Sequence, residues 1–222
     1  MPAKADAKKQ VAFYEDELLP LMEGAERSDW KLLFLDASHF VMGCDFLGYI
    51  YGTARRFVLT FSGRMRYNVL GAMDYVTKEV LTITNESYIT ATQVCEMLRK
   101  ISAEYTGKVV HLILDNARYQ KCKVVMDLAK ELGINLHYIP PYSPNLNLIE
   151  RFWKFVKGEL RSKYYDDFGV FRKRIDSIIA SASNENKQKI SSLIGQKVQL
   201  FDGLHSVCQN TFSLPTPPSI AA

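Results

Sequence analysis

The sequence carries one short pattern twice, Lys-Leu-Leu-Phe-Leu-Asp at residues 31–36 and Lys-Val-Val-His-Leu-Ile-Leu-Asp at residues 108–115. A short apolar run that ends in an acid is typical of a buried strand that stops at the edge of a sheet. Parallel neighbouring strands lie about 4.8 Å apart, so pairing of these two segments would bring Asp36 and Asp115 to one end of the sheet. The pattern therefore predicts two central strands and a shared acidic site.

Other strands are predicted on both sides of this pair. Residues 67–75 and 79–84 are expected to form an antiparallel hairpin, and residues 57–61 and 134–139 two further strands. A hairpin requires antiparallel pairing, whereas strands that alternate with helices favour parallel pairing. The predicted fold class is therefore α/β, with a mixed sheet flanked by helices.

Helices are expected where apolar residues recur with the 3.6-residue period. A short amphipathic helix over residues 11–25 has Pro20 near its end, and residues 1–30 form a helical or linker segment in this prediction. Residues 31–183 would be the main domain, and residues 184–222 a C-terminal extension with a loose Pro-rich tail from Ser213. The longer helices are predicted over residues 90–105, 119–132, 146–160 and 168–182.

Composition excludes several classes of protein. The chain has 222 residues, of which 47% are hydrophobic and 23% charged, so a disordered or fibrous chain is excluded. No apolar run approaches the roughly 18 residues of a membrane span, and the first residues lack a secretory h-region. The four cysteines form no C-x-x-C pair, which argues against a zinc site and favours a reducing, cytoplasmic location. Neither a dinucleotide-binding nor a phosphate-loop motif is present.

A third acid, Glu150, lies in the first turns of the helix that follows a Pro-rich loop. Ile149 and Trp153 belong to the apolar stripe of this helix, so Glu150 faces sideways, where a strand end could meet it. Carboxylate oxygens suit Mg²⁺, and two such ions about 3.5–4 Å apart can clamp both oxygens of a phosphodiester displacement. Simpler explanations remain open: an Asp at a strand end often forms a turn, and Asn147 could cap the helix with Glu150 completing a capping box.

The segment Ile-Pro-Pro-Tyr-Ser-Pro-Asn-Leu-Asn-Leu-Ile-Glu-Arg-Phe-Trp at residues 139–153 resembles the signature of insertion-sequence DDE transposases of the Tc/mariner superfamily. Leu-Asp-Asn-Ala-Arg at residues 114–118 resembles the second acidic block of that family, and Phe-Leu-Asp-Ala-Ser at residues 34–38 the first. Asp115 and Glu150 have 34 residues between them, as in the bacterial branch. The resemblance covers residues 31–163.

This resemblance implies an RNase H-like fold and an Asp-Asp-Glu site in which Asp36, Asp115 and Glu150 bind two Mg²⁺ or Mn²⁺ ions. It implies metal-dependent DNA cleavage and strand transfer, integration at a TA dinucleotide, and action as a homodimer in the bacterial nucleoid. Family members usually carry an N-terminal helix-turn-helix region. Only 35 residues precede Asp36, so the chain would be either one product of a split or frameshifted gene, with a separate helix-turn-helix polypeptide as a partner, or a truncation.

Positive charge gathers after Glu150. Residues 151–174 contain eight basic and three acidic residues, a surplus that exceeds the net charge of +4 of the whole chain. Basic side chains on this helix could hold the DNA backbone without reading its sequence, or could simply be solvated partners of Glu150. The predicted DNA contacts are Arg118, Arg151, Lys154, Lys157, Arg161 and Lys163, with a second cluster at Arg55, Arg56, Arg64 and Arg66.

Two neighbours of the acids, His39 and Asn116, are candidate accessory residues. His111 and His137 are expected to be core or edge residues of strands. The aromatic residues Tyr142, Tyr164 and Tyr165 could stack on bases, whereas Trp153 continues an apolar stripe.

Two competing functions remain open. Another RNase H-like nuclease would share the acids and release hydrolysed product without joining strands. A DNA-binding or dimerisation remnant of a transposase would have no catalytic role.

Overall fold

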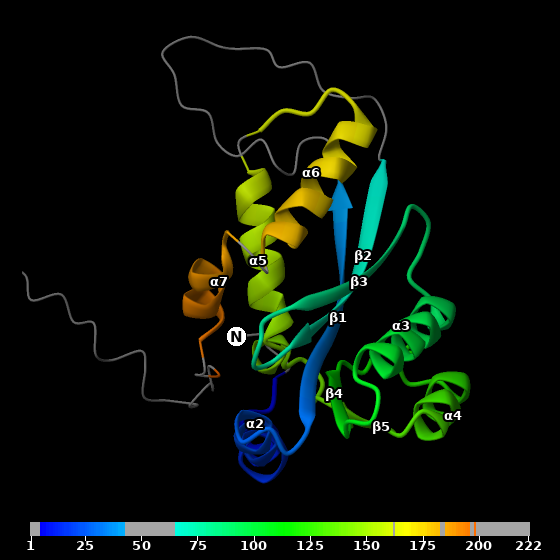
Figure 1. Cartoon of the computed structure of the whole chain (residues 1–222), viewed down its shortest axis with the longest axis vertical. Helices are drawn as coiled ribbons and strands as arrows, with labels where there is room; N and C mark the ends of the chain where they lie inside the picture. The colour runs from blue at the N-terminus through cyan, green and yellow to red at the C-terminus, as the bar shows by residue number, and fades with distance from the viewer. Residues whose placement is uncertain (1–4, 43–64, 162, 183–184, 196–197, 199–222) are drawn as a thin grey trace, which may run out of the picture.

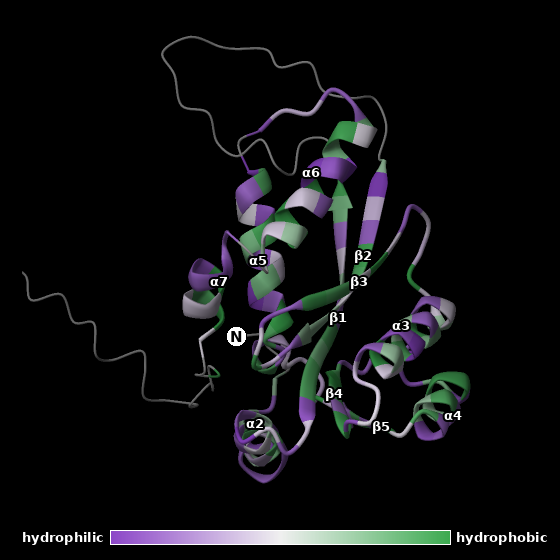
Figure 2. Cartoon of the chain, in the orientation of Figure 1, coloured by the Kyte–Doolittle hydropathy of each residue, from purple (hydrophilic) through white to green (hydrophobic). Residues whose placement is uncertain are grey.

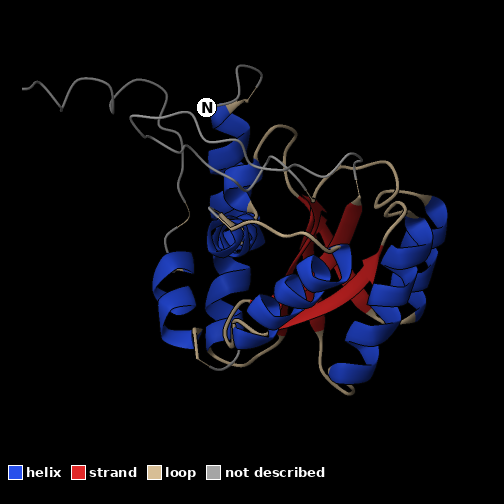
Figure 3. Ribbon diagram, turned by 90° about the horizontal axis from the view of Figure 1, so that it is seen from above, coloured by secondary structure: helices blue, strands red, loops and turns tan. Residues whose placement is uncertain are grey.

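The computed structural model describes residues 5–42, 65–161, 163–182, 185–195 and 198. Five strands form one sheet with helices on both of its faces (Figures 1 and 3). The strand predicted at residues 57–61, three of the four arginines of the second basic cluster and the Pro-rich tail lie outside the described residues. In the described part of the chain, no helix combines the length and apolar character that a membrane span needs.

The sheet is mixed, as predicted. Strand β1 pairs antiparallel with β2, and β2 with β3, whereas β1 and β4, and β4 and β5, pair in parallel. The order across the sheet is β3-β2-β1-β4-β5, so β1 lies at the centre. The strands are β1 (Lys31–Val41), β2 (Arg66–Asp74), β3 (Val80–Asn85), β4 (Val110–Leu114) and β5 (Ile134–Tyr138).

Strand β1 is longer than the sequence predicts, and Asp36 is not its last residue. The parallel pairing with β4 stops at Phe34 and Ile113, but pairing with β2 continues to Val41. Continued hydrogen bonding to β2 keeps the chain extended beyond the apolar run. Asp36 therefore lies just beyond the point where one neighbour of β1 ends and the other goes on.

The two faces of the sheet are covered by different helices (Figures 1 and 3). One face packs against α3 (Ala91–Glu104) and α4 (Lys123–Glu131), and the other against α5 (Ile149–Leu160) and α6 (Phe168–Ser181). Helix α7 (Lys187–Ile194) packs on α5 through Ile190 and Ile194. The hydropathy colouring shows purple polar residues on the outer sides of these helices, interrupted by green residues, most clearly on α4, where Val124 and Met126 are exposed (Figure 2).

Two helices start later than predicted. Helix α4 begins at Lys123, because residues 117–121 form a turn in which the N–H groups of Gln120 and Lys121 both donate to the Ala117 carbonyl. Helix α5 begins at Ile149 and follows a 3-10 turn over Pro144–Leu146. Extended backbone at Asn147 separates that turn from the helix.

The N-terminal segment is helical from Ala7 to Glu26, and this helical part belongs to the same core. Helices α1 (Ala7–Phe13) and α2 (Leu19–Glu26) are joined by a π-helical turn, η1 (Tyr14–Leu18), in which the N–H of Leu19 donates to the Tyr14 carbonyl. Pro20 follows this turn, so it lies inside the helical segment and not near its end. A wider turn accommodates proline, which clashes with the carbonyl four residues before it. Phe13 and Leu18 are buried together with residues of β1 and α5.

Candidate active site

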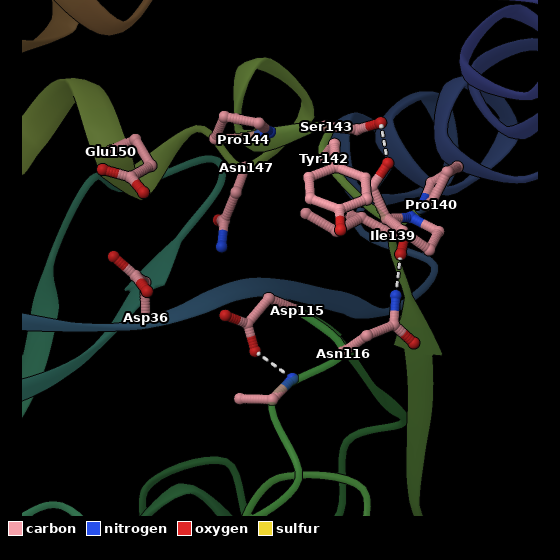
Figure 4. Close-up of a pocket in the computed structure, with 12 residues that line it drawn as sticks. Asp36, Asp115, Asn116, Ile139, Pro140, Tyr142, Ser143, Pro144, Asn147 and Glu150 are labelled. Carbon is pink, nitrogen blue, oxygen red and sulfur yellow. Dashed lines mark hydrogen bonds between the residues drawn. The ribbon is translucent and has the colours of Figure 1, made fainter. Parts of the chain in front are cut away.

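Three acids distant in sequence lie around one cavity of about 320 Å³ (Figure 4). Asp36 comes from β1, Asp115 directly follows β4, and Glu150 lies in the first turn of α5. The remaining wall is formed by Asn116 and the loop over residues 139–147. The structure thus brings together the three acids that the sequence predicts as a site.

Strands β4 and β1 end at different levels of the sheet, and this difference positions Asp36 and Asp115. Since β4 ends at Leu114, the chain turns away at Asp115 while β1 continues past it. The Oδ1 of Asp115 accepts a hydrogen bond of 2.8 Å from the N–H of Ala117, which closes the turn and leaves the second oxygen toward the cavity (Figure 4). The side chain of Asn116 donates to the Ile139 carbonyl and so ties the ends of β4 and β5 together.

A glycine opposite Asp36 lets α5 approach the sheet. Gly71 of β2 is the paired neighbour of Asp36, and residues paired in this way point their side chains to the same face. A Cβ at Gly71 would lie 2.6 Å from Cζ2 of Trp153 and 3.1 Å from Cδ1 of Ile149. Both side chains of α5 therefore need the bare backbone, and their packing places Glu150 at the rim of the cavity.

The acids of the site are electrostatically coupled. Burial raises the pKa of Asp36 to about 8, and the negative charges of Glu150 and Asp115 add to the rise, while a backbone hydrogen bond from Ala37 and the charge of Lys157 oppose it. Burial also raises the pKa of Glu150, with Lys157 lowering it and Asp115 raising it. Bringing several carboxylates together disfavours their charged forms, so this site gains from any cation that enters it.

The chemistry of the cavity fits a hard divalent cation. Its donors are carboxylate and amide oxygens, which Mg²⁺ and Mn²⁺ prefer. In their present positions, no three His, Cys, Asp or Glu side chains among the described residues are arranged to hold one ion. Mg²⁺ is commonly bound by one or two carboxylates together with waters and substrate phosphates, so a complete protein cage is not required.

Two asparagine side chains fasten the C-terminal end of the loop over residues 139–147. The side chain of Asn147 donates a hydrogen bond of 3.0 Å to the Leu35 carbonyl of β1, and Asn145 donates one of 3.0 Å to Gln10 of α1. The suggested capping box is not formed: Leu148 occupies the N-cap position, and no side chain caps the helix. The roles of Asn147 and Gln10 were not predicted from the sequence. For Asn147 a signal was present, because this polar residue stands between the apolar residues Leu146 and Leu148.

The predicted DNA contacts separate into different groups. Lys154, Lys157 and Arg161 are exposed on the same side of α5 as Glu150, and Lys157 acts electrostatically on both Asp36 and Glu150. Arg151 instead donates to the Ile194 carbonyl of α7, and burial lowers its pKa. Arg118 and Lys163 are exposed and lie outside the cavity wall.

Of the accessory candidates, Asn116 lines the cavity and His39 does not. Side chains alternate along a strand, so His39 points to the face opposite Asp36, where its Nδ1 lies 2.6 Å from Oδ1 of Asn68. His111 and His137 contact each other on β4 and β5, 2.9 Å apart.

The candidate aromatic residues also divide. Tyr142 lines the cavity and Tyr164 is exposed. Tyr165 packs on Phe171, and Trp153 is buried in the core.

The antiparallel strands β2 and β3 on one side of β1, the parallel strands β4 and β5 on the other, and an acidic cavity beside this central strand together define an RNase H-like fold. The profile of the DDE superfamily endonucleases matches residues 31–172. The chain belongs to this family.

Solved structures with the same fold include those of Mos1 transposase. A Mos1 transposase paired-end complex with left transposon end matches with a TM-score of 0.60 and 13% identity, covering 90% of this chain and 66% of that one. A Mos1 mariner paired-end complex with Mn gives 0.58 and 14%, covering 91% and 66%. The catalytic domain of Mos1 mariner transposase gives 0.54 and 12%, covering 89% and 99%. The chain thus spans just under two thirds of the longer Mos1 chains. A search of curated proteins finds no match.

Proposed function

We propose that the chain is the catalytic core of a DNA transposase, with residues 31–183 as its RNase H-like domain and Asp36, Asp115 and Glu150 as its catalytic acids. The observation that carries this proposal is the convergence of those three side chains on one cavity in a member of the DDE endonuclease family. The Mos1 complexes with transposon ends share the fold and support the choice of DNA as substrate.

The acids would hold Mg²⁺ or Mn²⁺ ions. Bound in this way, two such ions supply an activated water or 3′-hydroxyl and stabilise the departing 3′-oxygen. Asp36 would release its proton as it becomes a ligand, because its raised pKa leaves much of it protonated near neutral pH. Glu150, at the exposed rim, would face the incoming phosphate. Strand cleavage and then strand transfer would use the same acids.

The exposed basic side of α5 would hold the DNA. Lys154, Lys157 and Arg161 continue along the helix from Glu150, so a phosphate backbone that enters the cavity would meet their ammonium and guanidinium groups. Such contacts position DNA without reading its sequence. Integration at TA and a homodimer on paired ends complete the proposed assembly.

The test is nicking of supercoiled plasmid DNA in Mg²⁺ or Mn²⁺ by the full chain and by Glu150→Gln. We expect wild type to nick and Glu150→Gln to lose activity. The control is Glu159→Gln on the same helix, because Glu159 pairs with Lys189 at 2.8 Å and does not line the cavity. Equal activity of Glu150→Gln and wild type would remove Glu150 from the mechanism.

Strand transfer separates the transposase from its competitors. Incubation of pre-cut duplexes of the transposon ends with target plasmid should give joined products. Hydrolysis without joining would indicate an RNase H-like nuclease. DNA binding without cleavage or metal binding would indicate a non-catalytic remnant.

A further inference from the structure

Asn147 occupies an unusual position in the wall of the acidic cavity. It precedes α5 by two residues, is only 3% exposed, and lines the same cavity as the three acids. Figure 4 shows its amide between the carboxyl groups of Asp36, Asp115 and Glu150. This placement makes its two polar atoms part of the site.

The orientation of the amide is fixed by the neighbouring strand. Its nitrogen donates a hydrogen bond of 3.0 Å to the Leu35 carbonyl, one residue before Asp36. A carbonyl can only accept, so the nitrogen must face β1 and the oxygen must face the other way. Figure 4 shows this oxygen on the side of Glu150 and Asp36.

That oxygen has no hydrogen-bond partner in the described structure. A buried polar atom left without a partner costs about 1–3 kcal/mol, and such atoms are uncommon in folded proteins. Ionised acids around it have no proton to donate, and Asp36 would give up its proton when the cavity binds a cation. The missing partner is therefore expected to be an electron-pair acceptor that enters the cavity, and amide oxygens are ordinary ligands of hard divalent cations.

We propose that Oδ1 of Asn147 is a fourth oxygen donor of the metal site, beside Asp36, Asp115 and Glu150. This inference rests on the proposed function of the cavity. An asparagine suits the position because one planar group supplies a donor that anchors the loop to β1 and an acceptor aimed at the ion. Aspartate would supply the oxygen without the anchor, and alanine would supply neither.

The experiment measures Mn²⁺ affinity by electron paramagnetic resonance without DNA, and thermal stability in parallel. The full chain is compared with Asn147→Ala, Asn147→Asp and Asp36→Asn. Asn145→Ala is the matched control, because Asn145 lies on the same loop and bonds to Gln10 but does not line the cavity. We expect Asn147→Ala to weaken Mn²⁺ binding about tenfold, in the range seen for lost supporting groups of metal sites.

Asn147→Asp separates the oxygen from the anchor. Both variants lose the bond to Leu35 and with it thermal stability, and Asn147→Asp loses more because it adds a fourth carboxylate to the cavity, but only Asn147→Asp should bind Mn²⁺ at least as tightly as wild type. Equal weakening by Asn147→Ala and Asn147→Asp, or by Asn147→Ala and Asn145→Ala, would overturn the proposal and leave Asn147 as a loop anchor. Failure of wild type to bind Mn²⁺, or binding unaffected by Asp36→Asn, would overturn the proposed metal site itself.

Discussion

Two aspartates on neighbouring strands show how differently one sheet can treat the same side chain. Asp74, at the end of β2, is buried and fully partnered: it accepts hydrogen bonds from the N–H groups of Val76 and Thr77 and pairs with Lys31 at 3.2 Å. Asp36, on β1, faces two other acids, and its pKa is raised to about 8, chiefly by burial. The protein supplies partners for the charge of Asp74, whereas it surrounds Asp36 with two further acids.

The largest expected effect separates the two residues by activity. Asp36→Asn should reduce metal-dependent nicking about a thousandfold or more, because loss of an ion's transition-state stabilisation is worth several kcal/mol. Asp74→Asn should keep nearly full activity when assayed at a temperature where it remains folded. Plasmid-nicking rates at saturating Mn²⁺ measure both. Comparable losses of nicking activity in the two variants would contradict a catalytic role that is specific to Asp36.

Stability should separate them in the opposite direction. Asp74→Ala removes two hydrogen-bond acceptors from a turn and leaves the ammonium of Lys31 without its partner, so the free energy of unfolding should fall by about 2–4 kcal/mol. Urea denaturation measures this change. The control is Asp29→Ala, whose ion pair with Arg27 is exposed and should contribute less than about 1 kcal/mol. A loss for Asp74→Ala no greater than the control's would contradict the structural role.

The pH dependence sharpens the comparison. The pKa of Asp36 is about 8 in the folded protein against 3.8 as its ordinary value, so the folded state holds a proton that the unfolded state releases between these pH values. Stability of wild type should therefore fall as pH rises through this window, and Asp36→Asn should lack that part of the fall. In EDTA at pH 8.5 the variant should be more stable by several kcal/mol, up to the roughly 6 kcal/mol that a rise of the pKa from 3.8 to about 8 allows, with a difference near zero below pH 4. Parallel urea-denaturation profiles across pH 4–8.5 would contradict the unfavourable environment of Asp36.

The smallest expected effect concerns Lys157, whose charge lowers the pKa of both Asp36 and Glu150. Lys157→Gln should weaken DNA binding a few-fold and reduce the slope of log affinity against log salt concentration by about 1, as for one lost phosphate contact. Fluorescence anisotropy at several salt concentrations measures this slope. Lys130→Gln, on α4 of the opposite face, is the matched control and should leave the slope unchanged. An unchanged slope in Lys157→Gln would place the DNA elsewhere.

Much of the fold was predictable because apolar patterns specify its central elements. The mixed sheet, the hairpin and α3 follow from alternation, short apolar runs and helical periodicity, and the structure confirms them. The length of β1 was not predictable, since it depends on pairing with β2 beyond the apolar run. The late start of α5 depends on a 3-10 turn and on the anchoring of Asn147, neither of which periodicity reveals.

The acids of the candidate site were predictable from the sequence, but the hydrogen bonds that the surrounding residues make were not. Two apolar runs that end in an acid indicate Asp36 and Asp115, and the resemblance to the transposase family adds Glu150 with its spacing; all three line the cavity. Strand alternation alone could have excluded His39, which lies an odd number of residues from Asp36. The diversion of Arg151 to α7 and the bond between Asn145 and Gln10 connect segments far apart in sequence, so only the folded chain reveals them.

The absence of a side chain at Gly71 sets how closely α5, and with it Glu150, approaches Asp36. A Cβ at Gly71 would be too close to Trp153 and Ile149, so Gly71→Ala would push the start of α5 away from the sheet. This would move Glu150 away from Asp36 without altering any charge. Mg²⁺ demands oxygen ligands at about 2.0–2.1 Å, whereas Ca²⁺ accepts about 2.3–2.6 Å in looser shells. Isothermal titration should therefore show Gly71→Ala shifting ion preference from Mg²⁺ toward Ca²⁺. A single methyl group on a strand that contributes no ligand would thus govern which ions the site discriminates.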